Sequence, residues 1–259
     1  MYKEILVYLD PSADTASRLR LAVNLAKTHG ARLIGMEACS THAFEGEWLE
    51  RATGLPDLFQ ETLKLSGLEG RYFTIDGWRS TRDHQYAHYA DLIIASQTEM
   101  EDKKLVAAGI PEEVLLSAGV PILLLPYRWR ERPVGESVMI AWKATREATR
   151  AVHDAMPILT RAKKVTAFTF GPEPEGQGEE PDALVEYLRR HGVPARASKW
   201  WPNNSDLTPV DALFADLDTQ EADLIVAGAF GHARWVESLF GGVSRDLARQ
   251  PSLPVLLSH

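Results

Sequence analysis

The residues best suited to bind a ligand gather near the C-terminus, where Gly228, Gly231, Gly241 and Gly242 are followed by Ser244. The apolar run 223–227 before them is typical of a buried strand, and 243–249 after them has helix-forming composition. Beyond the carboxyl end of a strand in an open α/β sheet, loop amides and the next helix N-terminus can converge on an anion. The stretch therefore predicts a phosphate cradle, with a plain flexible loop as the alternative.

The chain contains an internal repeat. Residues 5–9 return as 138–142, residues 90–95 as 222–227, and residues 120–124 as 253–257, at separations of 133, 132 and 133. Three matched segments at nearly the same offset indicate two homologous domains. We expect them over residues 1–128 and 134–259, with residues 127–135 as the linker.

Each copy alternates apolar, β-rich runs with helical patterns. This alternation predicts two doubly wound, parallel, five-stranded sheets of the α/β, Rossmann-like class. The region 42–70 is expected to be irregular with helical segments. The predicted strands are 5–9, 32–38, 71–75, 91–96 and 120–125, then 137–142, 164–170, 195–200, 223–227 and 254–258; the predicted helices are 13–29, 80–89, 110–118, 145–161, 181–191, 208–219 and 243–249.

The amino-acid composition excludes several classes of partner and of site. The 259 residues are 45% hydrophobic and carry a formal net charge of −8, so neither nucleic acid nor an anionic membrane surface is an expected partner. Cys39 is the single cysteine, which excludes an intrachain disulfide and any multi-cysteine metal site. The start of the chain does not read as a signal peptide and no apolar run reaches the length of a membrane span, so we expect a cytoplasmic protein.

The C-terminal glycine spacing resembles the nucleotide loop of the universal stress protein family. Gly228, two residues, Gly231, nine residues and Gly241 precede Gly242, Val243 and Ser244. The strand and helix order of both halves is similar to the tandem type of this family, whose fold is adenine nucleotide alpha hydrolase-like. The resemblance implies an ATP-binding or nucleotide-responsive protein of the stress response, commonly a dimer. It also implies an acidic residue beside the nucleotide at the end of the first strand.

The first half keeps only the acid of that pattern. Asp10 follows the first strand, but Ser96 and Glu99 stand where the second half has Gly228 and Gly231. Pro111 is aligned with Ser244 and offers neither an N–H nor a hydroxyl. We expect the nucleotide loop of this half to be degenerate.

The second half keeps the glycines but has Lys143 at the position of Asp10. Lys143 and the loop residue Arg234 are each interpreted either as a phosphate contact or as a solvated side chain. Gly242 replaces a Ser or Thr of the family, which removes one hydroxyl. The resulting hypothesis places ATP, with or without Mg²⁺, in the second half; its cofactor-binding residues are Gly228, Gly231, Arg234, Gly241, Gly242, Val243, Ser244 and Lys143.

No P-loop with its lysine, nucleophile elbow or zincin helix occurs, and no catalytic constellation is found, so an enzyme is the weakest hypothesis. His84 and His88 have the spacing for a metal site on a helix, but an exposed helix face is favoured. The alternative function is an interaction or scaffold protein of the same fold without nucleotide. The apolar runs 120–125 and 254–258 are expected to pair within one chain, as an internal pseudo-dimer, and two chains to associate as a homodimer.

Overall fold

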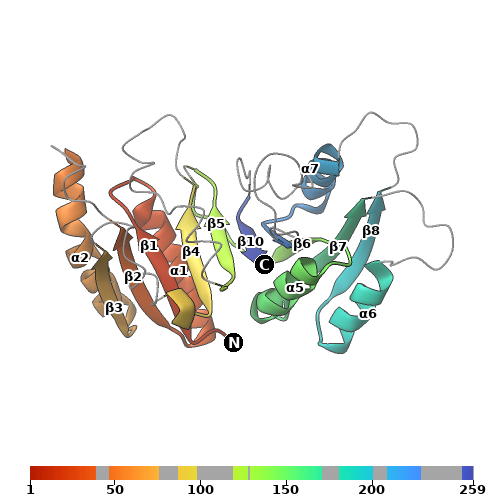
Figure 1. Cartoon of the computed structure of the whole chain (residues 1–259), viewed down its shortest axis with the longest axis horizontal. Coiled ribbons are helices and arrows are strands. Elements are labelled where there is room, and N and C mark those ends of the chain that lie inside the picture. Colours follow the sequence, from red (N-terminus) through yellow and green to blue (C-terminus); the bar gives the residue numbers. More distant parts are fainter. Residues whose placement is uncertain are drawn as a thin grey trace. The chain divides into compact units, whose positions relative to one another are not determined.

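The computed structural model describes residues 1–38, 47–75, 87–97, 119–127, 129–170, 181–200, 209–228 and 253–258. The chain forms two compact units, Met1–Glu131 and Arg132–His259, here called the first and second unit. Each unit contains five strands that pair in parallel (Figure 1). In the part of the chain that the structure describes, no helix has both the length and the apolar character that a membrane span needs.

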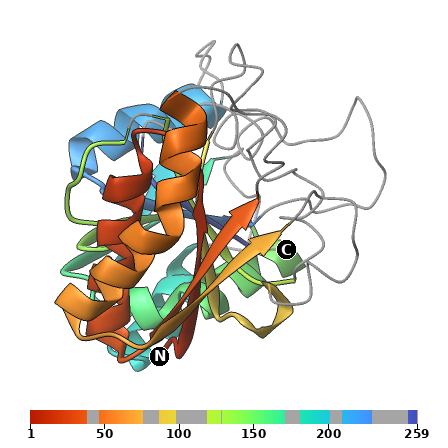
Figure 2. The same cartoon turned by 90° about the vertical axis from the view of Figure 1, so that its left-hand side faces the viewer.

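The first unit has the strand order β3-β2-β1-β4-β5. Helix α1 ends at Gly30, whose φ of 64° is the left-handed conformation that favours glycine at a helix C-terminus. Figure 2 shows α1 and α2 on the same face of this sheet. The elements are β1 (Glu4–Leu9), α1 (Thr15–His29), β2 (Arg32–Ala38), α2 (Glu47–Ser66), β3 (Gly70–Ile75), β4 (Leu92–Ser96) and β5 (Ile122–Leu125).

Helix α2 confirms that the region 42–70 contains helix, and it corrects the expected irregularity over residues 47–66. It is one helix of 20 residues with Pro56 inside it. Leu55, Phe59 and Leu63 recur every four residues and are all buried, so packing outweighs the breaking tendency of the proline. Phe59 lies against Gly35 of β2, where an added Cβ would come within 2.8 Å of the ring, so the glycine makes room for this helix.

The second unit repeats the arrangement with the order β8-β7-β6-β9-β10. Its core on the α7 side gathers Met139, Phe168, Leu213, Ile225 and Val255. The elements are β6 (Ser137–Ala141), α5 (Arg146–Leu159), β7 (Lys164–Phe170), α6 (Pro181–Arg190), β8 (Ala195–Trp200), α7 (Pro209–Gln220), β9 (Leu224–Gly228) and β10 (Val255–Ser258). The predicted helices 110–118 and 243–249 lie outside the described residues.

Two aspartates at the amino edge of the sheets make equivalent hydrogen bonds in the two units. Asp91 accepts the backbone N–H groups of Lys3 and Glu4 at 2.6 and 2.9 Å. Asp223, at the matching place, accepts those of Gly135, Glu136 and Ser137 at 2.8, 3.0 and 3.1 Å. In both units one carboxylate therefore holds the start of the central strand.

The central strand of each sheet marks the place where a ligand is expected. β1 pairs with β2 on one side and β4 on the other, and β6 pairs likewise with β7 and β9. In open α/β sheets the crevice at such a reversal of strand order, beyond the carboxyl ends of the strands, is the usual binding place. Asp10 and Ser96 lie at this place in the first unit. Lys143 and Gly228 lie at this place in the second unit.

Candidate functional site

Lys143 lies in the connection between β6 and α5. Its carbonyl accepts the N–H of Thr145 at 2.6 Å, which makes the connection tight. Thr145 caps the helix, because its Oγ1 accepts the N–H of Ala148 at 3.3 Å. The Lys143 side chain is exposed. An ammonium held beside a helix N-terminus can meet an anion that binds at this edge of the sheet.

Gly228 ends β9 directly against the first turn of α5. A Cβ at this position would lie 2.5 Å from the amide nitrogen of Ala148 and 2.6 Å from the carbonyl carbon of Glu147. Side chains do not tolerate such distances, so only glycine lets the strand end pack on the helix start. The first glycine of the loop thus has a packing role, and it brings the beginning of the loop beside the Lys143 connection.

The structure brings together two of the eight residues that the sequence predicts for the site. Gly228 and Lys143 follow neighbouring strands, since Ala141 of β6 pairs with Ala227 of β9. The other six predicted residues lie outside the described residues; they are Gly231, Arg234, Gly241, Gly242, Val243 and Ser244.

A polar cluster beside Gly228 was missed by the sequence reasoning. Ser258 of β10 pairs with Gly228, is 3% exposed, and donates its hydroxyl to Asp154 at 2.5 Å. Arg150 donates to the same carboxylate oxygen at 2.9 Å. The first unit has the buried Leu125 at the place of Ser258. A serine in the second half where the first half has a leucine was the one sequence signal for this polar cluster.

The matching edge of the first unit is closed by its own side chains. Arg18 donates to Asp10 Oδ2 at 2.7 Å, and the Ser12 amide donates to Oδ1 at 2.8 Å. Thr15 adds a bond from Oγ1 to the Asp10 carbonyl oxygen at 2.5 Å. The side chains of Arg18 and Asp10 are only 1% and 13% exposed. The carboxylate that the resemblance places beside a nucleotide is therefore used inside the protein.

Opposing effects act on the Asp10 carboxyl. Burial raises its pKa, whereas the charge of Arg18 and the hydrogen bonds from Ser12 and Arg18 lower it, and the net shift of the pKa is downward. Asp10 thus stays ionised opposite a buried guanidinium. The Nε of Arg18 is buried and has no hydrogen-bond partner in the described structure, so this cation depends on Asp10 and Thr15 alone.

The second unit has lost both members of this pair together. At an offset of 133, Asp10 becomes Lys143 and Arg18 becomes Ala151, which is buried in α5. Ser96 of β4 matches Gly228, and its buried hydroxyl has no hydrogen-bond partner within the described residues. The two units therefore present opposite chemistry at equivalent edges, one with a neutralised acid and one with an exposed cation.

Metal ligands do not gather in the described structure, which contains no group of three or more His, Cys, Asp or Glu residues able to hold an ion. His88 is exposed in the turn 87–89, while His84, Cys39 and Trp201 lie outside the described residues. Trp200 is half-buried against the core of the second unit.

Comparison with solved structures places both units in one known architecture. A universal stress protein from Archaeoglobus fulgidus DSM 4304 superposes with a TM-score of 0.72 over 98% of this chain and 95% of its own, at 16% identity. The chain has the universal stress protein fold.

Two Pseudomonas aeruginosa proteins share this universal stress protein fold over nearly the whole chain. A provisionally assigned universal stress protein from strain UCBPP-PA14 has a TM-score of 0.67 and 18% identity, covering 99% of this chain and 93% of its own. A protein of unknown function from strain PAO1 has a TM-score of 0.62 and 18% identity, covering 99% and 92%. No protein-family model matches the sequence, and no curated protein sequence matches it. At these identities the likeness establishes the fold.

Proposed function

We propose that the chain is a tandem universal stress protein whose second unit binds an adenine nucleotide at the carboxyl edge of its sheet. The observation that carries this proposal is the contact between Gly228 and the first turn of α5. It sets the start of the glycine loop beside a helix N-terminus and beside the exposed Lys143. Backbone donors and a cation then converge at one end of the sheet, which is the chemistry that a phosphate chain requires.

The roles of the loop residues follow from this placement. Gly231 and Gly241 let the backbone approach the phosphates, and Gly242, Val243 and Ser244 supply N–H groups at the start of the last predicted helix. The Ser244 hydroxyl and the Arg234 guanidinium add donors. ATP is the proposed ligand, and any Mg²⁺ would be bound mainly by its phosphates, as is usual for this ion.

The exchange of Asp10 for Lys143 supports a preference for the phosphate end of the ligand. The pair Asp10–Arg18, which carries no net charge, is replaced by Lys143 and Ala151, so the local charge rises by one unit in favour of an anion. The first unit, with Asp10 bound to Arg18, is proposed to bind no nucleotide and to serve as a structural partner. The protein is further proposed to be cytoplasmic, to pair strands 120–125 and 254–258 within the chain, and to form a homodimer.

A titration series tests which part of the ligand Lys143 contacts. ATP, AMP and adenosine are titrated calorimetrically into the wild type, the Lys143→Gln variant and the Lys163→Gln variant. Lys163 is also an exposed lysine, and it pairs with Glu136 at the opposite edge of the sheet, so it controls for the general loss of a charge. We expect Lys143→Gln to weaken ATP about tenfold or more, because one charge-assisted bond is lost, and to leave adenosine unchanged.

Equal ATP affinity in the two lysine variants would exclude Lys143 from the site. The alternative, an interaction protein of the same fold, is supported by the closed edge of the first unit, where Arg18 occupies the Asp10 carboxylate. It predicts no ATP heat in any variant and no protection of the wild type from unfolding by millimolar ATP.

A further inference from the structure

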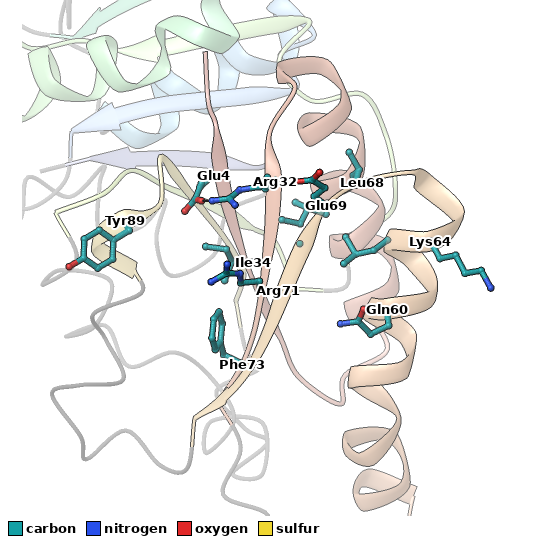
Figure 3. Close-up of a pocket in the computed structure, with 13 residues that line it drawn as sticks. Glu4, Arg32, Ile34, Gln60, Lys64, Leu68, Glu69, Arg71, Phe73 and Tyr89 are labelled. Atoms are coloured by element: carbon teal, nitrogen blue, oxygen red, sulfur yellow. Dashed lines mark hydrogen bonds and ion pairs between the residues drawn. The ribbon is translucent and has the colours of Figure 1, made fainter.

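The first unit has a hollow of about 670 Å³ far from the carboxyl edge of its sheet, at the amino ends of β1, β2 and β3. Glu4, Arg32 and Gly70, which are the first residues of these strands, line it. Figure 3 shows Ile34, Arg71 and Phe73 projecting from the strands and Gln60 on α2 pointing toward the strands, while the Lys64 side chain points away from them. Its volume is in the range of ordinary small-molecule sites.

The decisive feature of this hollow is the guanidinium of Arg71, which has no hydrogen-bond or ion-pair partner among the described residues. The repeat provides a matched comparison. Arg196 takes the place of Arg71 in the second unit, and its Nε donates to the hydroxyl of Thr166 at 3.3 Å. In the first unit, the strand neighbour of Arg71 is Ile34, exactly where Thr166 neighbours Arg196, and an isoleucine cannot accept a hydrogen bond.

The surroundings of Arg71 are apolar and aromatic. Phe73, two residues along β3, packs partly buried against the core, where the second unit has Ser198. Tyr89 lines the same hollow with 73% of its surface exposed, which is unusual for a ring of this size. Ile34 belongs to the same core cluster as Phe73, so these two side chains form an apolar wall beside Arg71. A planar apolar group could stack here while an attached anion reaches the guanidinium.

One guanidinium of the lining is left for an anion. Among the charged residues of the lining, Lys64 points its ammonium away from the strands (Figure 3). Arg32 is paired with Glu4, and this ion pair closes one side. Arg71 is left as the guanidinium available for bidentate recognition of a carboxylate, sulfonate or phosphate.

We propose that this hollow is a second binding site, for a small molecule that joins a planar aromatic group to one anionic group. The anion binds Arg71, and the aromatic group lies against Ile34, Phe73 and Tyr89. The site is independent of the proposed nucleotide site, since it lies in the other unit and at the amino rather than the carboxyl edge of a sheet.

The test uses 2-naphthoate as the probe, titrated calorimetrically into the full chain. Neutral 2-naphthamide keeps the ring without the charge, and acetate keeps the charge without the ring. We expect 2-naphthoate to bind at least about tenfold more tightly than either. Arg71→Gln should weaken 2-naphthoate about tenfold or more, whereas the matched variant Arg196→Gln should leave its affinity unchanged.

Two variants of Ile34 test whether the lack of a hydrogen-bond acceptor at this position leaves Arg71 available to the ligand. Ile34→Thr gives Arg71 the hydroxyl that Thr166 gives Arg196, so it should weaken 2-naphthoate several-fold by occupying the guanidinium. Ile34→Val has nearly the same shape without the hydroxyl and should bind like the wild type. Absence of 2-naphthoate binding, equal affinity for 2-naphthamide, or wild-type affinity in Arg71→Gln would each overturn the proposal. Lys143→Gln should bind 2-naphthoate like the wild type. This control separates the test of the hollow from the test of the nucleotide site.

Discussion

Arg18 lies fully buried in α1 with its guanidinium 2.7 Å from the Asp10 carboxylate, which follows the central strand of the first unit. The pair closes the edge of the sheet where doubly wound folds usually bind ligands. The equivalent positions of the second unit are Lys143 and Ala151, so that edge has no such closure. One unit thus has a carboxyl edge occupied by its own side chains, and the other has an exposed lysine at the equivalent edge.

Removal of Arg18 should destabilise the first unit strongly. Arg18→Met keeps much of the volume but leaves the Asp10 carboxylate buried without its partner, which costs about 3–5 kcal/mol in buried pairs. The free energy of unfolding, measured in urea, should fall by that order. Arg20→Gln is the control: its pair with Glu131 is about half exposed on both sides, so it should change stability by less than about 1 kcal/mol. Similar losses in the two variants would mean that Arg18 is not confined as described.

The pair of Asp10 and Arg18 also predicts how the free energy of unfolding decreases at acid pH. The folded pKa of Asp10 lies below its unfolded value, so its stabilisation is complete above the ordinary aspartate pKa of 3.8 and is lost as pH falls through that value toward the folded pKa. Asp10→Asn cannot be protonated, so its stability should fall less than that of the wild type between about pH 5 and pH 3. Parallel curves for the two proteins would contradict the assignment.

Gly228 and Gly54 should respond to alanine with opposite signs. Gly228→Ala adds a Cβ 2.5 Å from the Ala148 amide, and such overpacking should lower the stability of the second unit by about 1–3 kcal/mol. Gly54 lies in α2 with nothing within 4 Å of an added Cβ. Gly54→Ala should therefore raise stability by about 0.5–1 kcal/mol through helix propensity. Thermal unfolding of the two variants measures the contrast directly.

Restoring glycine in the first unit should not create a nucleotide site. In a Gly231→Glu background, which removes the proposed site, the double change Ser96→Gly and Glu99→Gly repairs the first loop in sequence only. Pro111 still lacks a donor, and Asp10 remains bound to Arg18. Calorimetry with ATP should show no heat. Recovered binding would show that the first unit is competent and that its loop residues alone had disabled it.

The strands and the repeat could be predicted from the sequence because they depend on local apolar patterns. The run 164–170, for example, was expected as a strand and is one, because its β-branched and aromatic residues favour a strand. The two aspartates Asp91 and Asp223 also lie inside the repeated segments, so their shared role could be sought there.

The candidate site could be predicted only in part because its contacts join distant residues. The glycine spacing marked Gly228, but its contact with Ala148 crosses 80 residues of chain and depends on how α5 packs on β9. Arg18 offered a weak signal, an arginine among the apolar residues of α1, and the partner it selects could not be read from spacing. Ser258 and Asp154 are 104 residues apart and belong to no motif.

The most direct test of the central claim is a calorimetric titration of ATP into the wild type, Ser244→Ala and Gly231→Glu. Micromolar binding corresponds to about 8 kcal/mol, and one charge-assisted hydrogen bond contributes roughly 1.5–3 kcal/mol. We predict micromolar binding by the wild type, affinity one to two decades weaker in Ser244→Ala, and no measurable binding in Gly231→Glu, which copies the first unit's own residue Glu99. A wild type that gives no heat with ATP and gains no thermal stability in millimolar ATP would contradict the account.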